Sequence, residues 1–179
     1  MVGRLGPTVS GMDATILVQE LGQHLEFSYT DMLCYAGPYS PAGVAIALKV
    51  MQRAFAALSP NHPPQRRSVT VRTPLVESGV RDGFESVTRA VTDGRYTVDP
   101  ALARPDRGKV LQSFVFQVSL AGRAATVLLR PGFVTGEFVE LGSKIERTQA
   151  EEAHFEQVKA QLAQRVLATP PEDVCELCK

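Results

Sequence analysis

An apolar run over residues 41–58 constrains the fold of this chain more than any other feature. Its large side chains recur at intervals of three and four residues, which is the spacing of one helix face. Ser40 and Pro41 precede the run in the order that typically begins a helix. We therefore expect a long helix that other elements bury against a sheet. The recurring positions are Val44, Ala47, Leu48, Met51, Phe55 and Leu58.

The rest of the chain mixes helical and strand patterns. We expect helices over residues 12–25 (capped by Ser10), 77–91 and 148–168, and strands over residues 68–75, 109–119 and 123–130. Ala121 and Gly122 fit a tight hairpin turn between the last two strands. Residues 27–35 and 94–107 look irregular, and a short strand is expected around Phe138. This order predicts an α+β fold, with an antiparallel or mixed sheet packed against helices.

Length and composition fit one globular domain. The chain has 179 residues, which we divide into a single α+β domain over residues 1–168 and a C-terminal tail over 169–179. Nineteen basic residues balance nineteen acidic ones, so no electrostatic footprint for nucleic acid is present. No apolar run approaches the ~20 residues that span a bilayer, and the first residues lack the pattern of a signal peptide. We therefore expect a cytoplasmic protein that binds neither nucleic acid nor membrane.

The loop before the long helix carries the first candidate site. Asp31, Cys34, Tyr39 and Ser40 gather around a helix start, where free N–H groups and partial positive charge favour a ligand. A thiol there would be activated by the helix dipole, whereas the alternative is a small buried hydrophobe. Tyr35 adds a second phenol, which could instead serve ring packing.

A second polar segment, on the expected helix over residues 77–91, is a candidate wall for the same pocket. Asp82 and Arg89 are the ligand-binding candidates there, although a solvated helix face explains their spacing equally well. If the pocket is catalytic, the candidate residues are Cys34, Tyr35, Tyr39, Ser40 and Asp82. Lys109 and Arg130 are further candidates for contact with an anionic group.

The chain ends in a C-x-x-C pair, Cys175 and Cys178. Two thiolates at this spacing can hold zinc, but a structural tetrahedral site needs four ligands, so the pair predicts a homodimer that shares the ion. The apolar stripe of residues 148–168 could also pack on a partner. A redox pair and a disordered, reactive tail are the alternatives.

Three segments and the terminal cysteine pair resemble a known family. Residues 36–42 stand where that family has a His-Gly-His-x-Cys-Pro-Gly loop before a long helix. Residues 82–90 stand at an Asp-Ala-x-x-x-x-Thr-Gly-Cys-like stretch, and residues 108–131 resemble its hairpin of two glycine-led apolar strands. On these grounds the chain resembles the E-type subunit family of formylmethanofuran dehydrogenase over most of residues 15–135. The resemblance implies the family's fold, and it implies a small-molecule ligand or a partner metalloenzyme.

The metal ligands of the family are replaced in this chain. The two histidines map onto Ala36 and Pro38, and the two cysteines map onto Ser40 and Ala90. We therefore expect a small-ligand- or metal-binding accessory protein of one-carbon or metalloenzyme metabolism, with zinc, if bound, at the terminal cysteines. The alternatives are an enzyme with a repurposed pocket that acts on a small polar substrate, and a cofactor or haem carrier.

Overall fold

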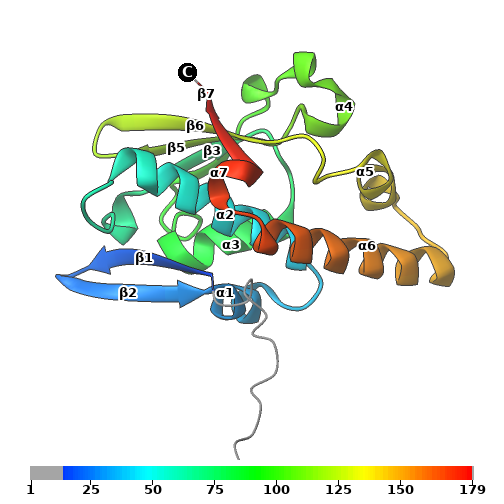
Figure 1. The fold of residues 1–179 in the computed structure, drawn as a ribbon, viewed down its shortest axis with the longest axis horizontal. Helices are drawn as coiled ribbons and strands as arrows, with labels where there is room; N and C mark the ends of the chain where they lie inside the picture. The colour runs from blue at the N-terminus through cyan, green and yellow to red at the C-terminus, as the bar shows by residue number, and fades with distance from the viewer. Residues whose placement is uncertain (1–13, 179) are drawn as a thin grey trace, which may run out of the picture.

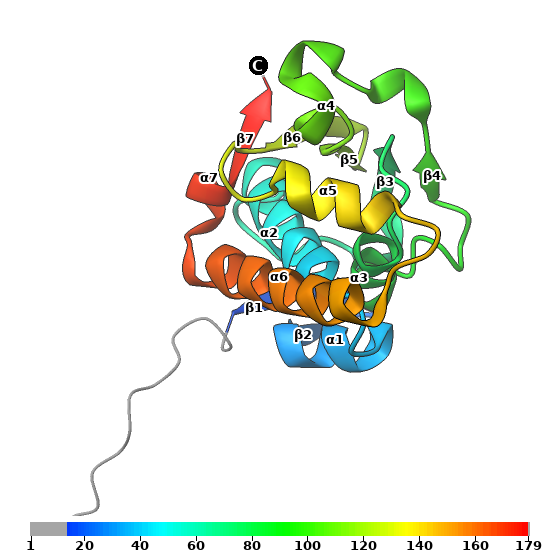
Figure 2. The same cartoon turned by 90° about the vertical axis from the view of Figure 1, so that its right-hand side faces the viewer.

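The computed structural model describes residues 14–178, which form an α+β fold with two sheets (Figures 1 and 2). The strands are β1 (Thr15–Glu20), β2 (Gln23–Ser28), β3 (Thr70–Thr73), β4 (Tyr96–Val98), β5 (Val115–Leu120), β6 (Arg123–Leu129) and β7 (Cys175–Cys178). The helices are α1 (Tyr29–Ala36), α2 (Pro41–Leu58), α3 (Ser78–Thr88), α4 (Gly108–Leu111), α5 (Gly136–Ser143), α6 (Gln149–Ala168) and α7 (Pro171–Val174).

Helix α2 is the centre of the core, as its sequence pattern predicts. It lies with α3 between the five-stranded sheet and the β1–β2 hairpin, and α6 packs along its side (Figure 2). By length and composition alone α2 could cross a membrane, but 72% of it is buried within the protein, which is the pattern of a core helix. Its side chains meet Val127 and Leu129 of the sheet and Leu162 of α6 in one apolar cluster.

The larger sheet is mixed, with strand order β4-β3-β5-β6-β7. Only the β3–β4 pair is parallel, and β5 and β6 form the expected hairpin around Ala121 and Gly122. Both turn residues have positive φ (51° and 77°), as a two-residue type I′ turn requires. The terminal segment, which we expected as a tail, contributes β7 to this sheet beside β6. Within the described residues it is therefore ordered, and the disordered alternative is wrong there.

The N-terminal prediction of a helix over residues 12–25 is wrong from residue 15 onward; Ser10 and residues 11–13 lie outside the described residues. The segment is a hairpin, in which Ile16 and Val18 of β1 are buried while Leu17 between them is exposed. Leu21 and Gly22 have φ values of 50° and 77° and form its turn. The apolar spacing over so short a stretch fits either a helix or a strand. The structure shows a strand, in which alternate residues are buried.

Four other expectations need correction. Residues 29–36 are not irregular but form α1, which begins at a capping box between Ser28 and Asp31. The segment around Phe138 is helix α5, capped by Thr135, and not a strand. Residues 108–111 form the short helix α4, so the strand begins at Val115. The 94–107 segment includes the three-residue strand β4. The expected helix over 148–168 is confirmed as α6, and that over 77–91 is confirmed as α3 but ends at Thr88.

Candidate ligand-binding cavity

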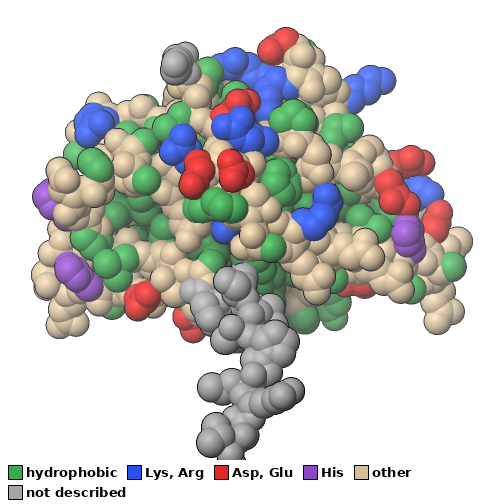
Figure 3. All heavy atoms as spheres, viewed as in Figure 1, with side chains coloured by type: hydrophobic (Ala, Val, Ile, Leu, Met, Phe, Trp, Pro, Cys, Tyr) green, Lys and Arg blue, Asp and Glu red, His purple; other side chains and the backbone are tan. Residues whose placement is uncertain are grey.

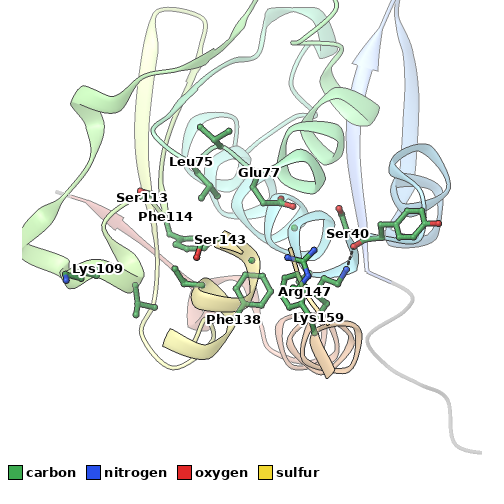
Figure 4. A pocket seen from close by; sticks show the side chains of 18 residues that line it. Ser40, Leu75, Glu77, Lys109, Ser113, Phe114, Phe138, Ser143, Arg147 and Lys159 are labelled. Atoms are coloured by element: carbon green, nitrogen blue, oxygen red, sulfur yellow. Dashed lines mark hydrogen bonds between the residues drawn. The ribbon is translucent and has the colours of Figure 1, made fainter. Parts of the chain in front are cut away.

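A cavity of about 380 Å³ lies beside the start of α2 (Figure 4). Its walls come from the start of α2, the segment before α3, α4 with the turn that follows it, α5, and the first half of α6. These walls belong to segments far apart in the sequence, so the packing of the whole domain forms the cavity. A volume of this order fits a small organic molecule.

Glycines let α2 and α3 approach closely at this wall. A Cβ atom on Gly43 would lie 2.2 Å from the Glu77 Oε2 atom, and one on Gly79 would lie 2.4 Å from the Ser40 Cβ atom. One turn further on, a Cβ on Gly83 would lie 2.7 Å from the Ala47 Cβ. All three separations are shorter than real carbon contacts, so no larger residue fits without movement. The short distance between the helices brings Glu77 against the first turn of α2.

Glu77 is the carboxylate of the cavity wall. It is the N-cap residue of α3, and its two oxygens accept hydrogen bonds from the Gly79 N–H (3.0 Å) and the Val80 N–H (2.6 Å). Burial raises the pKa of this carboxyl, while the two N–H bonds and the positive charge of Lys159 oppose that shift. Glu77 is therefore held in place by the backbone and faces the cations across the cavity.

Lys159 enters the cavity from α6. Its Nζ donates a hydrogen bond to the Tyr39 carbonyl oxygen at 2.8 Å and forms an ion pair with Glu156. The Nζ also lies 4.9 Å from the centroid of the Phe155 ring, and only 11% of the side chain is exposed. These contacts tie the loop before α2 to α6 and fix a cation close to the helix start.

Arg147 is the second cation held on this side of the cavity (Figure 4). Its Nη1 donates to the Leu141 carbonyl at 2.8 Å, its Nε pairs with Glu152, and its Cζ lies 4.9 Å from the centroid of the Phe155 ring. Within residues 14–178, Nη2 has no hydrogen-bond partner. The guanidinium is thus oriented by the protein, with one N–H₂ group left for another acceptor.

Between and beside these charges the lining is mainly apolar. Leu75, Phe114 and Phe138 form this part of the lining, and the Phe138 ring packs on Phe155 with 5.6 Å between centroids. Ser113 and Ser143 add hydroxyls at its edge. An apolar lining with a few fixed polar groups is the usual composition of a small-molecule site.

The structure brings two of the predicted loop residues to this cavity, Tyr39 and Ser40. Ser40 precedes α2 as expected, but its hydroxyl makes no capping hydrogen bond. Cys34 and Tyr35 are exposed on α1 and lie outside the cavity lining, and Asp31 is engaged in the capping box with Ser28.

The predicted residues on α3 also lie outside the cavity lining. Asp82 pairs with the neighbouring Arg81 at 3.2 Å, and Arg89, just past the helix end, pairs with Glu85 at 3.4 Å. Of the two hairpin cations, Lys109 lines the cavity, whereas Arg130 pairs with Glu176 at 3.3 Å. The ligand-binding role of Asp82 and Arg89 stays a prediction.

The two terminal cysteines point to opposite faces of the sheet, because they are three residues apart on one strand. The Cys175 side chain is fully buried in the core, where burial raises the pKa of its thiol to about 12. The Cys178 Sγ atom lies 3.2 Å from Nη2 of Arg104 on the other face. Among residues 14–178 no group of three or more His, Cys, Asp and Glu side chains is placed to hold a metal. Zinc binding stays a prediction, and one ion could join both thiols only if β7 left the sheet.

Sequence reasoning missed Glu77, Arg147 and Lys159. Lys159 had a detectable signal, since it interrupts the apolar stripe of α6 between Phe155 and Leu162 at the expected helical spacing. Nothing local marks Arg147 or Glu77, because their importance comes from elements that meet only in the folded chain.

Comparison with protein-family models and with curated proteins finds no match for this chain.

Proposed function

We propose that this protein binds a small organic molecule in the cavity beside the start of α2. One observation carries the proposal: Arg147, Lys159 and Glu77, each fixed by its own contacts, converge on a cavity whose remaining lining is mainly apolar. Two neighbouring cations and a carboxylate among apolar side chains are the kind of placed polar groups that orient a ligand in a small-molecule site. The metabolic setting, one-carbon or metalloenzyme metabolism in the cytoplasm, rests on the sequence resemblance and composition alone.

The enzymatic alternative has weaker support. This alternative gives catalytic roles to Cys34 and Tyr35, but both side chains are exposed on α1 and do not line the cavity. Tyr39 and Ser40 do line the cavity, but the Tyr39 side chain is 76% exposed and Ser40 adds only a hydroxyl group. Binding is therefore the function that the site supports best.

The test uses naphthalene probes with neutral, anionic and cationic substituents, namely 2-naphthamide, 2-naphthoate and 2-naphthylmethylammonium. Ligand-observed NMR should detect binding of at least one probe to the wild-type protein. Ser113→Trp would fill the cavity from its edge and should abolish that binding. Thr97→Trp, on an exposed position of β4, is the matched control and should retain it. Absence of binding by every probe, or equal binding to the Ser113→Trp variant, would contradict the proposal.

A further inference from the structure

The charged side chains that line the cavity are mostly positive. Lys109, Arg147 and Lys159 stand against the single carboxylate of Glu77. The chain as a whole is neutral, and acidic and basic side chains are interspersed on the face shown in Figure 3. The positive surplus therefore belongs to the cavity and is not a property of the whole surface.

The negative charge of Glu77 offsets one of these three positive charges, and its oxygens are already engaged by the backbone. They accept the N–H groups of Gly79 and Val80, which also places the carboxylate at the positive end of α3. Glu152 and Glu156 partly neutralise Arg147 and Lys159, but their side chains are 48% and 43% exposed and their pairing is weakened by solvent.

Both held cations keep donor capacity that the protein does not use. Nη2 of Arg147 has no hydrogen-bond partner among residues 14–178, and an ammonium group has three N–H bonds, of which Lys159 directs two to Tyr39 and Glu156. Donors that are fixed in advance bind an oxyanion without the entropic cost of ordering long side chains.

We infer that the ligand of this cavity is a small apolar carboxylate. Its anionic group meets Arg147 and Lys159, and its apolar body lies against Phe114, Phe138 and Leu75. A monoanion fits better than a phosphate dianion, because Glu77, which faces the two cations across the cavity, repels added negative charge. The inference rests on the proposed function and adds the chemical class of the ligand.

The test compares 2-naphthoate with its neutral isostere 2-naphthamide in the wild-type protein by titration. We expect 2-naphthoate to bind about tenfold more tightly, the effect of one or two charge-assisted hydrogen bonds that remain partly solvated. Arg147→Gln should remove most of this preference, because it weakens 2-naphthoate binding far more than the binding of 2-naphthamide, whose carbonyl makes only a neutral hydrogen bond. Arg72→Gln, which alters an arginine paired with Asp99 outside the cavity, should leave both affinities unchanged.

Two further measurements keep the test decisive if Arg147→Gln does not fold. Added sodium chloride should weaken 2-naphthoate binding but not 2-naphthamide binding, since only the former is electrostatic. The dianion 2-naphthyl phosphate should bind no more tightly than 2-naphthoate. Equal binding of the carboxylate and the amide, or tighter binding of the phosphate, would overturn the inference while leaving the proposed function in place. Failure of every probe would instead overturn the proposed function.

Discussion

At the scale of single residues, the contact between α2 and α3 depends on glycine. A Cβ atom on Gly79 would meet the Ser40 Cβ at 2.4 Å and the Ser40 carbonyl oxygen at 2.9 Å. The Ser40 carbonyl oxygen belongs to the backbone, so the clash can be relieved only if the two helices move apart. We expect Gly79→Ala to lower the free energy of unfolding by about 1–3 kcal/mol, the usual cost of overpacking.

The control for this substitution is Gly136→Ala, also in the first turn of a helix. There the nearest atom to an added Cβ is 4.0 Å away. The variant should be neutral or more stable by a few tenths of a kcal/mol, because alanine restricts the unfolded chain. Chemical denaturation of both variants checks the pair, and equal stabilities would contradict the close helix contact.

The cysteines should differ sharply in reactivity. The thiolate is the reactive form, and burial raises the pKa of Cys175 to about 12 while its side chain is fully enclosed. Cys34 is exposed on α1. Iodoacetamide should therefore alkylate Cys34 in the native protein and Cys175 only after unfolding. Peptide mapping by mass spectrometry over time measures this, and native Cys175 labelled as fast as Cys34 would show that β7 does not stay in the sheet.

At the scale of elements, the start of α6 should make stability depend on acid pH. Thr148 and Glu151 form a capping box, and Lys144 bonds the Glu151 carboxylate at 2.6 Å. The Lys144 hydrogen bond, followed by that from the Thr148 N–H, lowers the pKa of Glu151 to about 2. Since the folded-state pKa lies below the unfolded value, the stabilisation is present above about pH 4.5 and is lost as the pH falls toward 2.

Glu151→Gln tests this dependence. The melting-temperature difference between wild type and variant should be largest near neutral pH and should shrink through the acid range. Glu146→Gln, an exposed position in the preceding loop, controls for the loss of a carboxylate in general. A constant difference between wild type and Glu151→Gln at all pH values would show that the charge of Glu151 does not stabilise the start of α6.

The elements that could be predicted from sequence are those whose pattern is long enough to be unambiguous. Helix α2 has five turns of consistent apolar spacing, and the β5–β6 turn contains Gly122, which suits positive φ and lies between two strands with a clear apolar pattern. The β1–β2 hairpin was missed because Ile16, Leu17 and Leu21 also fit one helix face, and Leu is an uncommon residue at positive φ. Helix α5 was missed because its eight residues make only about two turns, which is too short a segment for helical spacing to be recognised.

The residues of the candidate site also divide into those that the sequence predicts and those that it does not. Tyr39 and Ser40 could be predicted because they directly precede α2, so local chain geometry places them. Glu77 and Lys159 face each other only because α3 and α6 both pack on α2, and neither contact has a local sequence signal that specifies its partner. A cavity built from distant segments is determined by tertiary packing, which periodicity does not report.

At the scale of the whole molecule, the prediction of a homodimer has lost one of its two arguments. The predicted apolar stripe of α6 consists of Phe155, Val158, Leu162 and Val166, of which all but the half-buried Val158 are buried within the chain itself. Most of this stripe is therefore not left for a partner. The remaining argument is a shared zinc ion at the terminal cysteines, and it too requires a rearrangement of β7.

The last prediction concerns β7 as part of the cooperative fold. Its four residues pair with β6, Cys175 and Val174 are fully buried, and the Arg130 N–H donates to the Val174 carbonyl at 2.8 Å. Amide groups hydrogen-bonded in this way exchange with solvent only when the sheet opens. We expect the paired amides of β7 to be protected from hydrogen exchange as strongly as those of β6. A chain that ends at Thr169 should melt at a lower temperature, because Val127 and Leu129 of β6 become exposed to solvent when β7 is absent. Exchange of β7 far ahead of β6, or an unchanged melting temperature on truncation, would show that the C-terminal cysteines belong to a detachable tail, free to hold a metal together.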